Sequence, residues 1–202
     1  MKSLVKLITG VLLFALVSCS SNPKVGRVSA DQQIDLSGYW NDADVRIVCE
    51  SLIADCLNSP RVDQAIKALG GRTPVVIVGK FRNESSEHID TAIISRTMEN
   101  TIFNSGKMDF VAGGGTRDDL RSERQDQLGN ASDYTASSIG NETGADFMLT
   151  GTVSSIIDNV GNLSVRAYFV NAELTSIETN QRMWMGRNDE IKKTIKKPKA
   201  KL

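Results

Sequence analysis

The apolar positions between Asn41 and Gly106 recur at helical spacings in two stretches. Spacings of three and four predict an amphipathic helix that begins at Asn41 or Asp42 and is stopped by Pro60. A second helix is predicted from about Glu87 to Ser105, with Gly106 as its C-terminal break. The apolar side of the first helix consists of Val45, Val48, Cys49, Leu52, Ile53, Cys56 and Leu57, and the core row of the second of Ile94, Met98 and Ile102.

Other stretches have the pattern of β-strands. Residues 74–81 contain four consecutive β-branched side chains, Val75 to Val78, so we expect a central strand that is buried on both faces. Residues 107–112 follow the second helix as another strand, which gives a β-α-β order. After Asp146 the period changes to two. We expect three further strands there, at 147–153, 163–170 and 181–188, joined by turns near Gly161 and near Asn180.

These elements predict an α/β fold. We expect a mixed sheet of about four to five strands, with helices packed on both of its faces and an antiparallel meander at the C-terminal end. Additional helices are predicted from Thr116 to about Leu128 and within residues 132–143.

The first residues of the chain have the features of a bacterial export signal. Lys2 and Lys6 precede an apolar run, which ends in Leu16-Val17-Ser18-Cys19 and resembles a lipobox. A lipobox implies cleavage between Ser18 and Cys19 and a lipid on the Cys19 thiol. The alternatives are an ordinary signal peptide with an incidental cysteine, or an uncleaved helix. The apolar run is about half of the roughly 20 residues that span a bilayer, which favours the lipobox.

We expect four segments along the chain. The position after Cys19 is Ser20 rather than Asp, which resembles lipoproteins sorted to the periplasmic face of an outer membrane. The segments are a lipoprotein signal peptide at 1–18, a flexible tether at 19–37, an α/β domain at 38–191 and a basic disordered tail at 192–202.

Charge is distributed unevenly. Of the 24 basic residues, two precede Cys19 and six lie in 192–202, which leaves 16 in the body against all 24 acidic residues. An acidic body argues against nucleic acid as a partner. The lysine-rich tail could contact anionic lipid, although a solvated tail is the simpler interpretation.

The residues that could support catalysis or ligand binding are few. His88 is the single histidine and begins a polar helix face, where a surface role is expected. Cys49 and Cys56 lie seven residues apart, about 10 Å along a helix, too far for a disulfide, so we expect two buried thiols. Residues 113–115 are three glycines without the rest of a phosphate-binding motif. We therefore expect no catalytic residue, no metal and no cofactor.

Several stretches together resemble a known family. They are Val75 to Asn83, Gly144 to Gly151, and Glu173-Leu174 followed by Glu178 and Trp184. In this order they are similar to the LpoB-type outer-membrane lipoproteins that activate penicillin-binding proteins. The fold group also includes the N-terminal domain of TolB and the core of the CsgG-type secretion lipoprotein.

The resemblance implies a protein that is not an enzyme itself. It would be a lipoprotein that binds a docking domain of a bifunctional penicillin-binding protein, a peptidoglycan synthase, and raises its activity in cell-wall synthesis. A CsgG-like role in envelope secretion or assembly is the alternative. That role needs amphipathic hairpins with roughly 10 residues per strand, and the sequence predicts none of that length beyond the core strands. The resemblance maps no partner-binding residue onto this chain.

Overall fold

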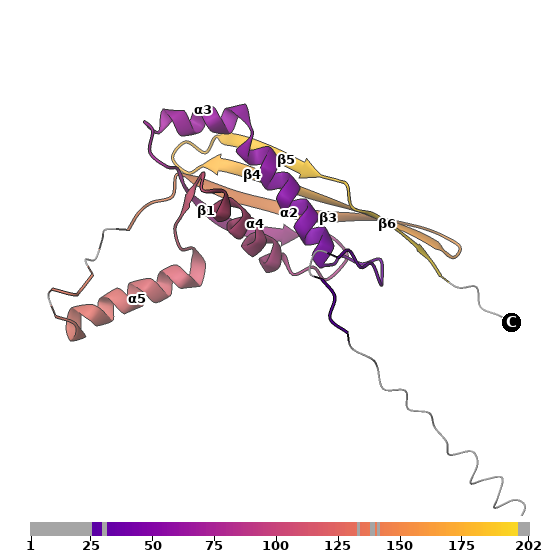
Figure 1. Cartoon of the computed structure of the whole chain (residues 1–202), viewed down its shortest axis with the longest axis horizontal. Helices are drawn as coiled ribbons and strands as arrows, with labels where there is room; N and C mark the ends of the chain where they lie inside the picture. Colours follow the sequence, from indigo (N-terminus) through magenta and orange to yellow (C-terminus); the bar gives the residue numbers. More distant parts are fainter. Residues whose placement is uncertain (1–25, 30–31, 133, 138–139, 141, 198–202) are drawn as a thin grey trace, which may run out of the picture. The chain divides into compact units, whose positions relative to one another are not determined.

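The computed structural model describes residues 26–29, 32–132, 134–137, 140 and 142–197. The chain divides into two units, Met1–Gln32 and Gln33–Leu202. In the first unit the described residues form no regular secondary structure, and the Gln32 backbone N–H donates to the Ser29 carbonyl oxygen at 3.2 Å. The second unit contains the sheet and its helices (Figure 1).

Two helices, α2 and α4, form where the apolar spacing predicts them, although α4 begins at Thr91 rather than near Glu87. Helix α2 spans Asp42–Leu57 and begins with a capping box between Asn41 and Asp44, while α3, Pro60–Ala68, has its proline in the first turn. Helix α4 spans Thr91–Ser105 and ends at Gly106, whose φ of 65° is the left-handed conformation that favours glycine. Helix α5, Gly114–Asn130, buries none of its residues. The helix predicted within 132–143 is absent from the part of that segment that the structure describes.

The six strands in the described part of the chain form one mixed sheet, which confirms the predicted fold class and the C-terminal meander. Five strands lie in the order β2-β1-β3-β4-β5, and β6 pairs with β4. Strand β1 is parallel to β2 and β3, and the other pairs are antiparallel. The strands are β1 Val75–Asn83, β2 Asp109–Phe110, β3 Phe147–Val160, β4 Leu163–Ser176, β5 Arg182–Asn188 and β6 Lys192–Lys196.

The core lies between the sheet and the helices α2 and α4, which pack against each other and against the same face of the sheet (Figure 1). This corrects the expectation of helices on both faces. Val76 is fully buried on the helix side, whereas Ile77, the next residue of β1, is only half-buried and lies next to Gly113. The central strand is therefore covered fully on one face only.

Aromatic rings lie against glycines on the core face. Gly151, Ala172 and Gly186 form one cross-strand row through β3, β4 and β5. A Cβ atom on Gly151 would overlap the ring of Phe81, and one on Gly186 would overlap the ring of Trp184. Glycine is needed at both positions because any side chain there would displace a buried ring.

Both predicted ends of the domain need correction. Lys192–Lys196, expected to be disordered, form strand β6 along β4. Residues Gln33 to Ser37, expected to belong to the tether, are part of the second unit, where Asp35 accepts hydrogen bonds from Gln33 and Asn41. Residues 198–202 and the signal segment 1–18 lie outside the described residues.

Candidate functional site: the open face of the sheet

The face of the sheet opposite the helices has a hollow of about 540 Å³ over β1, β3, β4 and β5. Two cross-strand rows run through its floor, Thr150–Glu173–Met185 and Thr152–Asn171–Arg187. Because successive side chains of a strand point to opposite faces, these rows alternate with the buried row Gly151–Ala172–Gly186. The hollow is lined by Lys80, Arg82, Thr150, Gly151, Thr152, Asn171, Ala172, Glu173, Arg182, Met185, Gly186 and Arg187.

Four basic side chains and one acidic side chain line this hollow. Arg182 pairs with Glu173 at 3.0 Å, and Arg187 pairs with Asp189 at 3.3 Å. These arginines are more than half exposed, so they keep donors that face solvent. The hollow therefore favours an anionic partner, and guanidinium groups fit carboxylates best.

The lining residues include hydroxyl and amide groups but no histidine, cysteine or pair of carboxylates. Met185 contributes an apolar side chain that is 64% exposed. Exposed arginines beside an exposed methionine are typical of protein interfaces.

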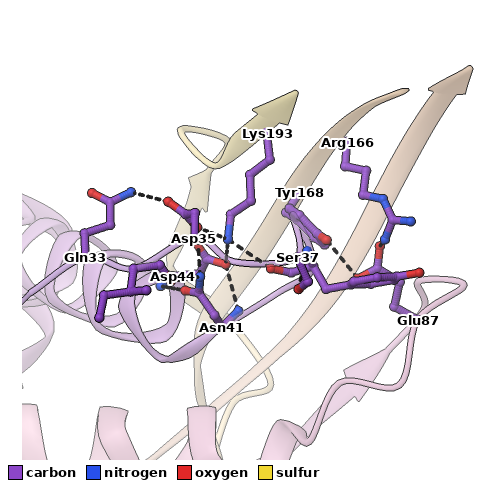
Figure 2. A network of polar contacts seen from close by, with 11 residues as sticks. Gln33, Asp35, Ser37, Asn41, Asp44, Glu87, Arg166, Tyr168 and Lys193 are labelled. Atoms are coloured by element: carbon purple, nitrogen blue, oxygen red, sulfur yellow. Dashed lines mark hydrogen bonds and ion pairs between the residues drawn. The ribbon is translucent and has the colours of Figure 1, made fainter. Parts of the chain in front are cut away.

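A polar cluster on the other face of the sheet joins the two ends of the second unit (Figure 2). The Lys193 ammonium group contacts Asp44 at 2.6 Å and Asp35 at 2.7 Å, and it donates to the Tyr39 carbonyl oxygen at 3.0 Å. Asp44 is 1% exposed, and its burial raises the pKa of the carboxyl group, although Lys193 opposes that shift. Lys193 lowers the pKa of Asp35. The cluster holds the segment before α2 against β6.

A second group of polar side chains lies beside this cluster (Figure 2). Glu87 accepts hydrogen bonds from Arg166 at 2.6 Å and from the Tyr168 hydroxyl group at 2.8 Å. Burial, and then the hydrogen bond to Glu87, raise the pKa of Tyr168. The Arg166 guanidinium group lies 3.9 Å from the centre of the Tyr39 ring. The Arg166 and Glu87 side chains are only 13% and 7% exposed, so both carry charges that must be paired in the folded state.

Most of the residues that the sequence singled out lie in the described part of the chain. Cys49 and Cys56 are buried free thiols, as predicted, and burial raises the pKa of each to about 12. His88 is exposed, also as predicted. Gly114 begins α5 with a φ of 52°. Ser18 and Cys19 lie outside the described residues. Within the described ranges, histidine, cysteine and carboxylate side chains form no cluster that could hold a metal ion.

The family described as peptidoglycan-synthase activator LpoB matches residues 44–189. The chain belongs to the LpoB family. The match begins in α2 and ends just after β5, so it covers β1 to β5, most of α2 and the whole of α3, α4 and α5.

Solved structures resemble the chain at low sequence identity. The C-terminal domain of LpoB from Escherichia coli is 20% identical, with a TM-score of 0.44, and covers 71% of this chain and 96% of that one. The LpoB C-terminal domain from Salmonella enterica is 18% identical, with a TM-score of 0.43, over 76% of this chain and 99% of that one. Lipoprotein GNA1162 from Neisseria meningitidis is 19% identical, with a TM-score of 0.39, over 60% of this chain and 83% of that one. The family assignment depends on the sequence match over residues 44–189.

Curated proteins give no significant match. Of the helices that the structure describes, none is both long enough and apolar enough to cross a membrane.

The basic residues of the open face and the Lys193 cluster were missed by the sequence analysis. Polar and apolar residues alternate in the sequence around Glu173 and around Arg187, which indicates exposed strand positions. This alternation does not show that the exposed side chains surround one hollow. Lys193 was assigned to a disordered tail because its acidic partners lie about 150 residues earlier in the chain.

Proposed function

We propose that this LpoB-family chain is a lipoprotein, lipidated on Cys19 at the periplasmic face of the outer membrane, that activates a bifunctional penicillin-binding protein. The family match over residues 44–189 is the observation that supports activation of a peptidoglycan synthase. The lipobox at Leu16 to Cys19 supports the anchor. The chain would bind a non-catalytic docking domain and favour the active conformation of the synthase. That requires the activator to bind the active conformation more tightly than the resting one.

The hollow on the open face is the docking surface in this proposal. Its excess of basic side chains would meet an acidic patch of the docking domain, and Met185 would supply apolar contact. Since the body of this chain is acidic while the hollow is basic, the hollow is where an acidic partner would meet least repulsion.

Charge reversal on the open face tests the docking surface. We expect Lys80→Glu combined with Arg187→Glu to weaken binding to a purified bifunctional penicillin-binding protein about tenfold or more. Acceleration of glycan polymerisation should be lost with it. The matched control is Arg61→Glu combined with Lys67→Glu, which reverses two exposed charges on α3. If both double variants activate the synthase like the unchanged protein, this hollow is not the docking surface.

The anchor has a separate test. We expect Cys19→Ala to abolish incorporation of labelled palmitate and to release the protein from the membrane fraction, while the circular dichroism of the domain stays unchanged. Normal fractionation of this variant with the outer membrane would refute lipidation of Cys19 as the anchor.

One observation favours a second candidate, a CsgG-like role in envelope secretion or assembly. Strands β3 and β4 each span 14 residues, and β3 is twice as long as the strand predicted at 147–153. Both strands are longer than the roughly 10 residues per strand that a membrane-entering hairpin needs. Recovery of detergent-stable oligomers of this chain, without any synthase, would favour that role over activation.

A further inference from the structure

The end of the β3–β4 hairpin forms an arm with its own surface. We define the arm as Ile156–Ala167 together with β6, because the pairing of β1 with β3 ends at Val153 and only three strands continue. Figure 1 shows this hairpin and β6 extending beyond the end of α2. Three cross-strand rows lie on the face of the arm that continues the open face of the sheet: Val160–Leu163–Lys196, Asp158–Val165–Thr194 and Ile156–Ala167–Lys192.

These rows place apolar side chains beside lysines. Ile156 is 62% exposed, Val160 73% and Leu163 42%. Lys196 in the first row and Lys192 in the third row are exposed at the β6 edge. Asp158 is the one acidic residue among the nine residues of these rows. An exposed apolar surface bordered by lysines fits a partner that has an apolar interior and an anionic surface.

The opposite face of the arm is already occupied. Lys193, which points to that side, contacts Asp35 and Asp44, and Gly38 lies against Ile195. The arm therefore has one face packed against the domain and one face on which Ile156, Val160 and Leu163 are exposed.

The arm also lies where the chain leaves the domain toward its N-terminus. Asp35 is held by Lys193 of β6, and 15 residues separate it from Cys19. Fully extended, they reach about 50 Å. If Cys19 carries the lipid, as proposed above, the arm stays within reach of the anchoring membrane.

We propose that the apolar face of the arm rests on an anionic lipid bilayer. Ile156, Val160 and Leu163 enter the boundary between headgroups and acyl chains, while Lys192 and Lys196 contact lipid phosphates. This contact orients the domain on the membrane, which a flexible tether alone does not do.

A position-specific label tests the contact. The full lipidated chain with Val160→Cys, labelled with an environment-sensitive dye, is reconstituted into vesicles of phosphatidylcholine alone or mixed with phosphatidylglycerol. Native Cys49 and Cys56 are buried and stay unlabelled. Brominated lipids should quench the dye at least twofold more in the anionic vesicles. The control is Ile177→Cys, at an exposed apolar position in the turn between β4 and β5.

Charge reversal separates this contact from the anchor. Lys192→Glu with Lys196→Glu should lower the population of quenched dye about tenfold, whereas Arg61→Glu with Lys67→Glu should not. Flotation of the vesicles reports the lipid anchor independently of the dye. The proposal is overturned if the Val160 label floats with the vesicles but is unquenched in both lipid mixtures. It is also overturned if the label is shielded only on adding the synthase, or only when the chain self-associates.

Discussion

The two faces of the sheet differ in how their charges are handled. On the helix side, Asp44 is buried and the side chains of Glu87 and Arg166 are largely buried, and each has an ionic partner at 2.6 Å. On the open side, the basic residues Lys80, Arg82, Arg182 and Arg187 line a hollow, and the ion pairs of the three arginines are exposed. A buried charge must be paired for the chain to fold, whereas an exposed charge can be kept for a partner. The helix face thus determines stability and the open face is available for binding.

The largest contrast between the faces is expected at two adjacent residues of β1. Val76→Asp places a carboxylate in the fully buried core, so we expect loss of cooperative unfolding at 25 °C. Ile77→Asp places it on the half-buried open side, next to Gly113, and the domain should still fold with reduced stability. Thermal unfolding followed by circular dichroism measures both. Equal transitions for the two variants would contradict the difference between the faces.

The next effect concerns the Lys193 cluster. Lys193→Met leaves Asp44 buried without its cation, and we expect the free energy of unfolding to fall by about 3 kcal/mol. Adding Asp44→Asn should restore part of this loss because the amide carries no charge. Urea unfolding gives both values. If the single and double variants lose the same amount, the loss is not caused by an unpaired carboxylate.

The smallest effect is a pH dependence of stability at Asp146, which directly precedes β3. Asp146 accepts from Arg72 at 2.7 Å and from the Val75 backbone N–H at 2.8 Å, and Arg72, more than the backbone, lowers the pKa of this carboxyl group. A carboxyl group with a lowered pKa stabilises the folded state above its ordinary value of 3.8, and this contribution disappears as the pH falls through the lowered pKa.

Asp146→Asn should therefore lower the melting temperature at pH 7 by about 3 °C or less. The difference from the unchanged protein should shrink toward pH 2.5. Calorimetry at several pH values checks this sign. A difference that grows on acidification would contradict the assignment to the Arg72 pair.

Local patterns were sufficient to predict the helices that build the core. Ile94, Met98 and Ile102 were assigned from their spacing alone, and all three are buried. The length of β3 was underestimated because Ser154, Ser155 and Asn159 interrupt the alternation, while their pairing with β4 depends on tertiary structure. The open face was not predicted because the full burial of Val76 and the partial burial of Ile77 depend on where the helices pack. A run of β-branched residues does not contain that information.

The parallel pairing in the middle of the sheet has a consequence for the order of folding. Val76 pairs with Phe147, so β1 finds its neighbour only after a long intervening segment has been synthesised, whereas β3 and β4 meet through a two-residue turn. Contacts between distant residues form slowly because closing a long loop costs entropy. Trp184 and Ile191 are the last members of the core. The apolar sides of α2 and α4 therefore remain uncovered until nearly the whole chain has emerged.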